Sequence, residues 1–379
     1  MKLLSLLTIG VLLSLPLQAD KLSGDFAAKQ TEAKLTEAKL TAAEPTEPST
    51  LLPDRQAALP SMAKQADDLY LQPAPLSDIP AGDFGDKVRL GYQLFVNTQQ
   101  LRDKYVGNEL NCVNCHMNAG MKANASPLWA AYFAYPAYRK KNDKVNSFQE
   151  RIQGCFTYSM NGKAPAANSP ELVAISAYSY WLGMSGLMRQ YKIVGPVPEL
   201  SDLELVKGAK RDDFPMPAEI ATQQDITALS QLPGRGYPKA LQPELAYSPD
   251  RGVVVYQAHC QVCHGEDGQG QMIAGVAALP PLWGAQSYNW GAGMHRVNTA
   301  ADFIYENMPL GKSVQLTVQQ AWDVAAYLNS FDRPQDPRFN GDVSKTQASY
   351  HQHQGYYGQS IAGKPILGSE SFAVFPAKK

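Results

Sequence analysis

Two short motifs of two cysteines and a histidine carry the most recognisable chemistry in this 379-residue chain. They are Cys112-Val-Asn-Cys115-His116 and Cys260-Gln-Val-Cys263-His264. In C-x-x-C-H, two thiols on one turn can form thioethers with the vinyl groups of a haem, and the adjacent imidazole can bind the iron. A zinc site built from both motifs would leave the two histidines without a role. We therefore predict two covalently bound haems c, each held by the cysteines and ligated by the histidine of one motif.

A methionine lies where the iron of the second haem needs its other axial ligand. The segment Tyr305-Glu-Asn-Met-Pro-Leu-Gly311 stands between the second haem motif and the next predicted helix. Thioether ligation by Met308 would favour ferrous iron and raise the potential, which suits a haem that passes electrons out. Met272 and Met294 are competing candidates, which we interpret as core methionines that fill gaps.

The first haem has two candidate distal ligands, Cys155 and Met160. Cys155 is the one cysteine left after the four thioether cysteines, and an unpaired thiol in an oxidising compartment suggests a function. The haem motifs lie 148 residues apart, and this offset places the equivalent of Met308 at Ser159 or Met160. Spacing alone does not choose between thiolate and thioether.

Helical patterns surround both haem motifs in the same order. Apolar residues at helical spacing precede them at 88–95 and 252–257. Pro170 and Thr317, the latter in a Thr-x-x-Gln capping box, mark the starts of the helices that follow. We predict an all-α protein of two tandem cytochrome c-like domains with long loops, each with a helix, a haem motif, a loop bearing the distal ligand and a closing helix.

The flanking sequence indicates an exported chain. Residues 1–19 combine an early lysine, an apolar run and a small residue at the end, which predicts a cleaved signal peptide, with an uncleaved anchor as the alternative. Repeats of Thr-Glu-Ala-Lys-Leu followed by prolines predict a disordered spacer. No later run approaches the ~20 apolar residues of a membrane span, so we expect a periplasmic protein without one. The expected parts are spacer 20–60, first domain 61–200, linker 201–245, second domain 246–335 and C-terminal tail 336–379.

Composition excludes several classes of function. Lys and Arg number 34 and Asp and Glu 35, so the net charge of −1 gives no support to nucleic-acid binding. Five cysteines are too few for a disulfide-dense scaffold. In the tail, His351-Gln-His353 could bind a metal, but we interpret this pair as part of a solvated loop because it offers few ligands.

The first half of the chain resembles the dihaem thiosulfate dehydrogenases (the TsdA family) beyond the haem motif itself. The shared strings are Asn118-Ala-Gly120, Tyr135-Pro-Ala-Tyr138-Arg139, Arg151-Ile-Gln-Gly-Cys155-Phe156 and Ser159-Met-Asn-Gly162, within a likeness that covers roughly residues 85–335. The resemblance implies that His116 and the thiolate of Cys155 ligate an active-site haem. Some family members have a lysine that exchanges with the methionine at the second haem. Asn307 stands there instead, so we expect plain His264/Met308 ligation.

The resemblance also implies an activity, the oxidation of two thiosulfates to tetrathionate or the reverse reaction. Cys155 would carry a sulfur adduct, and Arg151 and Ser159 match the family's positions best. Both substrates are dianions, so the site needs fixed positive charge, for which Arg139, Lys140 and Lys163 are further candidates. The expected electron partner is a small soluble c-type cytochrome or another redox protein. A non-catalytic dihaem electron carrier is the main alternative, and a dihaem peroxidase is a weaker one.

Overall fold

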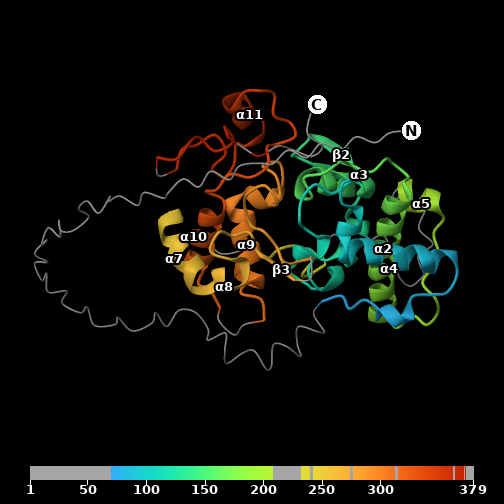
Figure 1. Cartoon of the computed structure of the whole chain (residues 1–379). Helices are drawn as coiled ribbons and strands as arrows, with labels where there is room; N and C mark the ends of the chain where they lie inside the picture. The colour runs from blue at the N-terminus through green and yellow to red at the C-terminus, as the bar shows by residue number, and fades with distance from the viewer. Residues whose placement is uncertain are drawn as a thin grey trace, which may run out of the picture. The chain divides into compact units, whose positions relative to one another are not determined.

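The computed structural model describes residues 70–207, 232–239, 242–273, 276–311, 315–361, 363–370 and 372. The predicted signal peptide and spacer lie outside the described residues, as does most of the predicted linker. The described chain is mostly helical, as expected (Figure 1). It also contains two short antiparallel strand pairs that the sequence did not predict. Among the described residues, no helix combines the length and the apolarity needed to cross a bilayer.

The first helical unit surrounds the first haem motif. Its α-helices and its strand pair are α2 (Asp83–Val96), α3 (Phe148–Gly154), α4 (Pro170–Gln190), α5 (Asp202–Lys207), β1 (Ala137–Arg139) and β2 (Lys144–Asn146). Single 3-10 turns fill much of the rest, at Leu76–Asp78, Thr98–Leu101, Cys112–Asn114, Asn118–Gly120, Leu128–Ala130 and Tyr132–Ala134. Helix α4 begins where predicted, because Ser169 caps it and proline occupies its first position.

The second helical unit surrounds the second haem motif. Its elements are α7 (Pro249–His259), α8 (Gln261–His264), β3 (Gln271–Ile273), β4 (Val276–Leu279), the 3-10 turn Gly293–His295, α9 (Val297–Asn307), α10 (Val318–Leu328) and α11 (Val343–Tyr350). The predicted capping box at Thr317 is present, with hydrogen bonds in both directions between Thr317 and Gln320. The haem motif follows α7 directly, so this helix fixes where the second haem is attached.

Both units contain the same close crossing of two helices. Gly91 of α2 meets α4 at a point where a Cβ would stand 2.0 Å from the carbonyl oxygen of Ala174. Gly252 of α7 meets α10 in the same way, with its Cβ position 2.0 Å from the carbonyl oxygen of Asp323. Any side chain there would force the helices apart, because packed interiors leave no room for such overlap. The repeated crossing supports the predicted internal repeat.

Each unit contributes residues to the core of the other. Met117 and Ala125, which follow the first haem motif, are buried in the core of the second unit. Tyr288 and Ala292 of the second unit are buried in the core of the first. The segments around the two haem motifs are therefore packed together.

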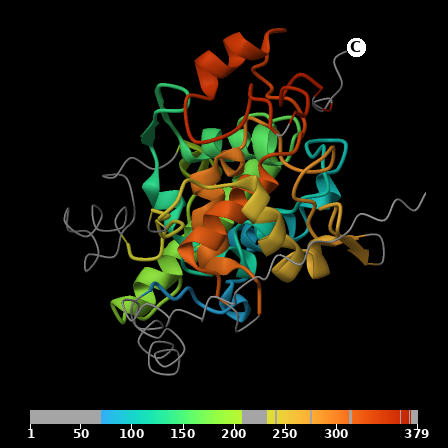
Figure 2. The ribbon, with the colours of Figure 1, turned by 90° about the vertical axis from the view of Figure 1, so that its left-hand side faces the viewer.

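The C-terminal segment packs on the second unit. Tyr356 and Tyr357 are buried in its core, and both views show the red segment with α11 above the orange helices (Figures 1 and 2). His351 is only 6% exposed and stacks on Tyr357 with ring centroids 4.1 Å apart. The prediction of a solvated loop at residues 351–353 is therefore wrong, because tertiary packing covers these histidines.

Candidate functional site

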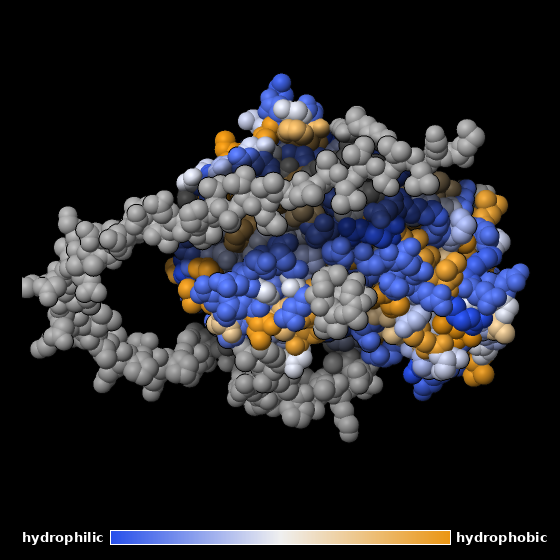
Figure 3. Space-filling view, viewed as in Figure 1, coloured by the Kyte–Doolittle hydropathy of each residue, from blue (hydrophilic) through white to orange (hydrophobic). Residues whose placement is uncertain are grey.

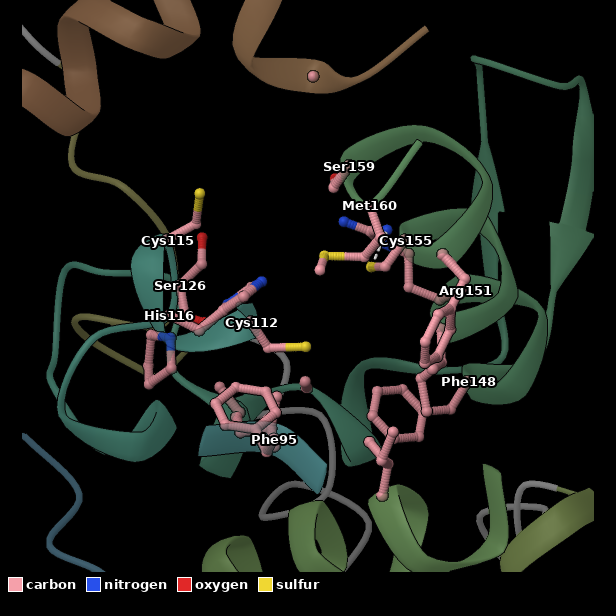
Figure 4. Close-up of a pocket in the computed structure, with 18 of the residues that line it drawn as sticks. Phe95, Cys112, Cys115, His116, Ser126, Phe148, Arg151, Cys155, Ser159 and Met160 are labelled. Atoms are coloured by element: carbon pink, nitrogen blue, oxygen red, sulfur yellow. Dashed lines mark hydrogen bonds between the residues drawn. The ribbon is translucent and has the colours of Figure 1, made fainter. Parts of the chain in front are cut away.

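A cavity of about 350 Å³ separates the first haem motif from the helical segment that carries Cys155 (Figure 4). We call it the haem cavity. The sulfur atoms of Cys112 and Cys115 lie on one side of it, and those of Cys155 and Met160 on the other. Many of the side chains that line it are apolar, among them Phe95, Leu128, Ile152, Phe156 and Ile175. Sulfur and imidazole groups on opposite sides of an apolar cavity fit a covalently attached haem.

The histidine of each haem motif is oriented by a backbone carbonyl. Nδ1 of His116 lies 2.6 Å from the carbonyl oxygen of Ser126, and Nδ1 of His264 lies 3.0 Å from that of Pro280. A carbonyl can only accept a hydrogen bond, so Nδ1 carries the proton and Nε2 keeps its lone pair for iron. Burial lowers the pKa of both histidines, which favours this neutral form.

The thiols of the first motif are poorly suited to a zinc site. Burial raises the pKa of Cys112 to about 12 and that of Cys115 to about 11. Zinc binds the thiolate, whereas a thioether carries no charge into the protein interior. The described residues of this site therefore fit haem attachment better than thiolate coordination.

Cys155 stands at the junction of α3 and a π-helical turn, η7 (Cys155–Ser159). The N-terminus of helix α3 is stabilised by a capping box between Ser147 and Glu150. Arg151 lies one helical turn before Cys155, and its Nη1 donates to the sulfur at 2.8 Å (Figure 4). The electrostatic interaction with Cys155 raises the pKa of Arg151. The pair thus has the geometry of a guanidinium beside a thiolate acceptor.

Two asparagines hold η7 in place through its backbone carbonyls. Nδ2 of Asn108 donates to the carbonyl oxygen of Ser159 at 2.8 Å. Asn289 belongs to the second unit, and its side-chain Nδ2 donates to the carbonyl oxygen of Thr157 at 2.9 Å. Its backbone N–H donates to the carbonyl oxygen of Tyr158 at 3.2 Å. Sequence reasoning missed both residues, because nothing near them in the chain marks a partner more than 50 residues away.

A second, larger cavity of about 1040 Å³ adjoins the haem cavity, and Tyr135 and Arg235 line both. We call it the basic pocket, after its charged lining residues Arg139, Lys140, Lys141, Arg235 and Arg296. No aspartate or glutamate among the described residues lines either cavity. In the view of Figure 3, hydrophilic residues gather across the surface between the two helical units. The arrangement suits a path for small anions.

Lys141 is the most perturbed cation of the basic pocket. Burial, together with the positive charges of Arg338 and Arg151, lowers the pKa of Lys141 to about 7. Its Nζ lies 3.7 Å from the ring centroid of Tyr158 and donates to the carbonyl oxygen of Gly291. Its charge therefore changes near neutral pH, unlike that of an ordinary lysine.

The residues expected to bind the substrate anions lie in two different places. Arg151 and Ser159 line the haem cavity, whereas Arg139 and Lys140 line the basic pocket. Nη1 of Arg139 donates to the Tyr135 hydroxyl at 2.5 Å, which ties it to the boundary of the two cavities. Lys163 is exposed and lines neither cavity, so its proposed role in the site has no structural support.

The second haem motif is built differently on its distal side. Met308 follows α9 directly and packs, partly buried like Cys260, against the second core. Asn307 is buried and donates to the carbonyl oxygens of Asn124 and Phe303, each at 3.1 Å. Met294 lines the haem cavity of the first unit instead. The side chain of Met272 lies outside the described residues.

Two family descriptions match the chain, one over each haem motif. The SoxA/TsdA cytochrome c domain matches residues 100–182, which include Cys155. The Cytochrome c family matches residues 249–332, which include Met308. Both matches agree with two tandem cytochrome c domains and with haem c as the cofactor.

Relatives of known name extend the similarity over most of the chain. The thiosulfate dehydrogenase of Stutzerimonas stutzeri (strain A1501) is 46% identical over 319 residues, 83% of this chain and 91% of that protein. The thiosulfate dehydrogenase of Thiomonas intermedia (strain K12) is 44% identical over 297 residues, 78% of this chain and 82% of that protein. Thiosulfate dehydrogenase (TsdBA) from Marichromatium purpuratum has a similar structure, with a TM-score of 0.67 and 40% identity over 82% of this chain. This chain covers 59% of the latter.

Proposed function

The chain belongs to the thiosulfate dehydrogenase family, and we propose that it joins two thiosulfates into tetrathionate in the haem cavity. The observation that carries this proposal is the pair of Arg151 and Cys155, 2.8 Å apart, opposite the first haem motif. A thiolate at this place is a soft nucleophile that suits the soft sulfane sulfur of thiosulfate. We assign His116 and Cys155 as the axial ligands of this haem.

The proposed chemistry proceeds in two balanced steps at the sulfur of Cys155. The thiolate and the sulfane sulfur of one thiosulfate form an S–S bond, and two electrons leave. The sulfane sulfur of a second thiosulfate then attacks that of the adduct, breaks its bond to Cys155, and releases tetrathionate and the free thiolate. Bound haem supplies the redox chemistry, since each iron can accept one of the two electrons. The same steps in reverse would reduce tetrathionate.

Fixed positive charge makes the meeting of two dianions feasible. Arg151 stays beside the sulfur throughout and offsets the charge that develops there, while Ser159 lines the same cavity. Arg139 and Arg235 at the boundary with the basic pocket would attract the second dianion before it reaches the adduct. Because the adjoining cavities lack acidic lining residues among the described part of the chain, nothing there counters this attraction.

The second unit would pass the electrons on. We propose His264 and Met308 as axial ligands there, because Met308 follows α9 and Asn307 offers no amine. Thioether ligation would give a haem bound there the higher potential, so electrons would leave from it to a small soluble c-type cytochrome or a similar redox protein. We further propose that residues 1–19 direct the chain to the periplasm, where haem c proteins are assembled.

A non-catalytic electron carrier is the competing function, and one observation favours it. Met160 directly follows η7, as Met308 follows α9, and its sulfur also faces the haem cavity (Figure 4). If Met160 were the ligand, Cys155 would be a bystander and small molecules would not turn over.

An assay of the purified dihaem protein distinguishes the two functions. With thiosulfate and ferricyanide, we expect one tetrathionate for every two ferricyanides reduced. With tetrathionate and a reduced dye, the same preparation tests the reverse direction. Ferricyanide reduction that needs no thiosulfate, or no tetrathionate formed, would support the electron carrier.

A further inference from the structure

Three histidines converge at the boundary of the second unit and the C-terminal segment. Nε2 of His295 lies 3.1 Å from Nε2 of His353 and 3.1 Å from Nδ1 of His351. One ring nitrogen from each of the three histidines lies within 4.8 Å of those from the other two. His295 ends the turn before α9, and the other two follow α11. None of the three has a part in the proposed reaction.

The outer contacts of two rings fix which nitrogens carry protons. Nδ1 of His295 faces the carbonyl oxygen of Ala292, so it must donate. Nε2 of His351 lies 3.0 Å from a carboxylate oxygen of Asp336, which Arg338 holds with bonds of 2.9 and 2.6 Å. That nitrogen also donates. The inner nitrogens of both neutral rings therefore present lone pairs to each other at 3.1 Å.

Facing lone pairs need a cation between them. Nδ1 of His353 is buried and makes no well-formed hydrogen bond. A single metal ion satisfies all three inner lone pairs at once, which a single proton does not.

We propose that His295, His351 and His353 bind one divalent zinc-type ion. Zinc bonds to nitrogen of 2.0–2.1 Å in a tetrahedral site place the ligand nitrogens about 3.3 Å apart, close to the two observed distances. Neutral imidazoles are suitable ligands for such an ion. The contacts of His351 with Asp336 and of His295 with Ala292 are those that orient metal-binding histidines.

The site leaves a fourth position for water or an anion. His353 lines the basic pocket, so this position can be reached from there. The ion would join the segment after α11 to the turn before α9. Zinc would therefore stabilise the attachment of the C-terminal segment, independently of whether the first haem oxidises thiosulfate.

Metal analysis of the dihaem protein tests the proposal. The protein is purified without a histidine tag or a nickel column, stripped with a chelator and titrated with zinc alone. We expect one zinc per chain, and binding at least about 100-fold weaker in His353→Gln, because one of three protein ligands is lost. His259→Gln is the matched control, since this half-buried histidine lies outside the cluster. Haem content verifies folding of each variant.

Zinc-edge X-ray absorption gives a second readout that the haem irons do not obscure. Three imidazole nitrogens at about 2.0 Å would support the site. An absence of zinc binding in the wild type, equal affinity in His353→Gln, or a spectrum of oxygen or sulfur ligands would each overturn it. If His353→Gln fails to fold, the titration and the spectrum of the wild type decide alone.

Discussion

The two haem units share the same helical framework around the haem motif and differ in the segment that faces the motif across it. In both, a glycine-mediated helix crossing supports the haem motif, and a backbone carbonyl orients the proximal histidine. In both, a methionine directly follows a helical segment, Met160 after η7 and Met308 after α9. The first unit adds Arg151 and Cys155 before that methionine. The described first unit thus differs from the second by a thiol and a guanidinium placed just before the corresponding methionine, which is where we propose the catalytic site.

The surroundings differ as much as the ligands. The first unit opens through the haem cavity into the basic pocket, which gives substrates access. In the second unit, Asn307 ties the segment before Met308 to the loop at Asn124. This contrast supports the proposal that the first unit reacts with small anions and the second transfers electrons.

Removing the positive charge beside Cys155 should have the largest effect on the activity that we assign to the first unit. Arg151→Gln should lower kcat for thiosulfate about 100-fold or more, because an oriented charge at the developing anion is lost. Steady-state kinetics with ferricyanide measure this. Arg139→Gln, which changes a residue of the basic pocket, should mainly raise KM. Equal losses of kcat in the two variants would contradict the special position of Arg151.

Removing the thioether of Met308, the distal ligand that we propose for the second unit, tests the comparison from the other side. Met308→Gly should eliminate the high-potential step of a redox titration and slow electron exit, because thioether ligation stabilises ferrous iron. Met294→Leu, which keeps an apolar side chain in the haem cavity, is the control and should keep both steps. If Met308→Gly shifts the low-potential step instead, the assignment of the two haems is reversed.

Weakening the hydrogen bonds that hold η7 in place should lower kcat less than the loss of Arg151. Asn289→Ala leaves the carbonyl oxygen of Thr157 and the side-chain oxygen of Asn161 without this donor, at a cost of about 1–3 kcal/mol in the free energy of unfolding. We expect about tenfold lower kcat with the haem content unchanged. Gln286→Ala removes another contact between the units, with Arg102, and should leave kcat unaltered. A variant Asn289→Ala with wild-type kcat would show that this asparagine does not position Cys155.

The smallest effect concerns pH. Because the pKa of Lys141 is about 7, its positive charge is present below pH 7 and is lost as the pH rises through this value. The KM for thiosulfate should therefore rise several-fold between pH 6 and pH 8. In Lys141→Gln this dependence should flatten, whereas Lys140→Gln, on an exposed neighbour, should retain it. An unchanged profile in Lys141→Gln would assign the titration to another group.

Local sequence patterns predicted what depends on local structure. The haem motifs, the capped start of α4 and the capping box at Thr317 each require residues at fixed short spacing. The basic pocket was not predictable, because it combines the β1–β2 hairpin, Arg235, Arg296 and residues after α11. His351 was misjudged for the same reason, since its burial comes from Asp336 and Tyr357.

The choice between Cys155 and Met160 is the central claim, and two variants with one turnover assay test it most directly. Cys155→Ala should lose all thiosulfate-dependent turnover and the low-spin His/thiolate spectrum of the first haem, while both haems stay attached. Met160→Leu should retain activity, since it loses only packing worth about 1 kcal/mol. Turnover retained in Cys155→Ala, with the haem spectrum changed only in Met160→Leu, would contradict the account.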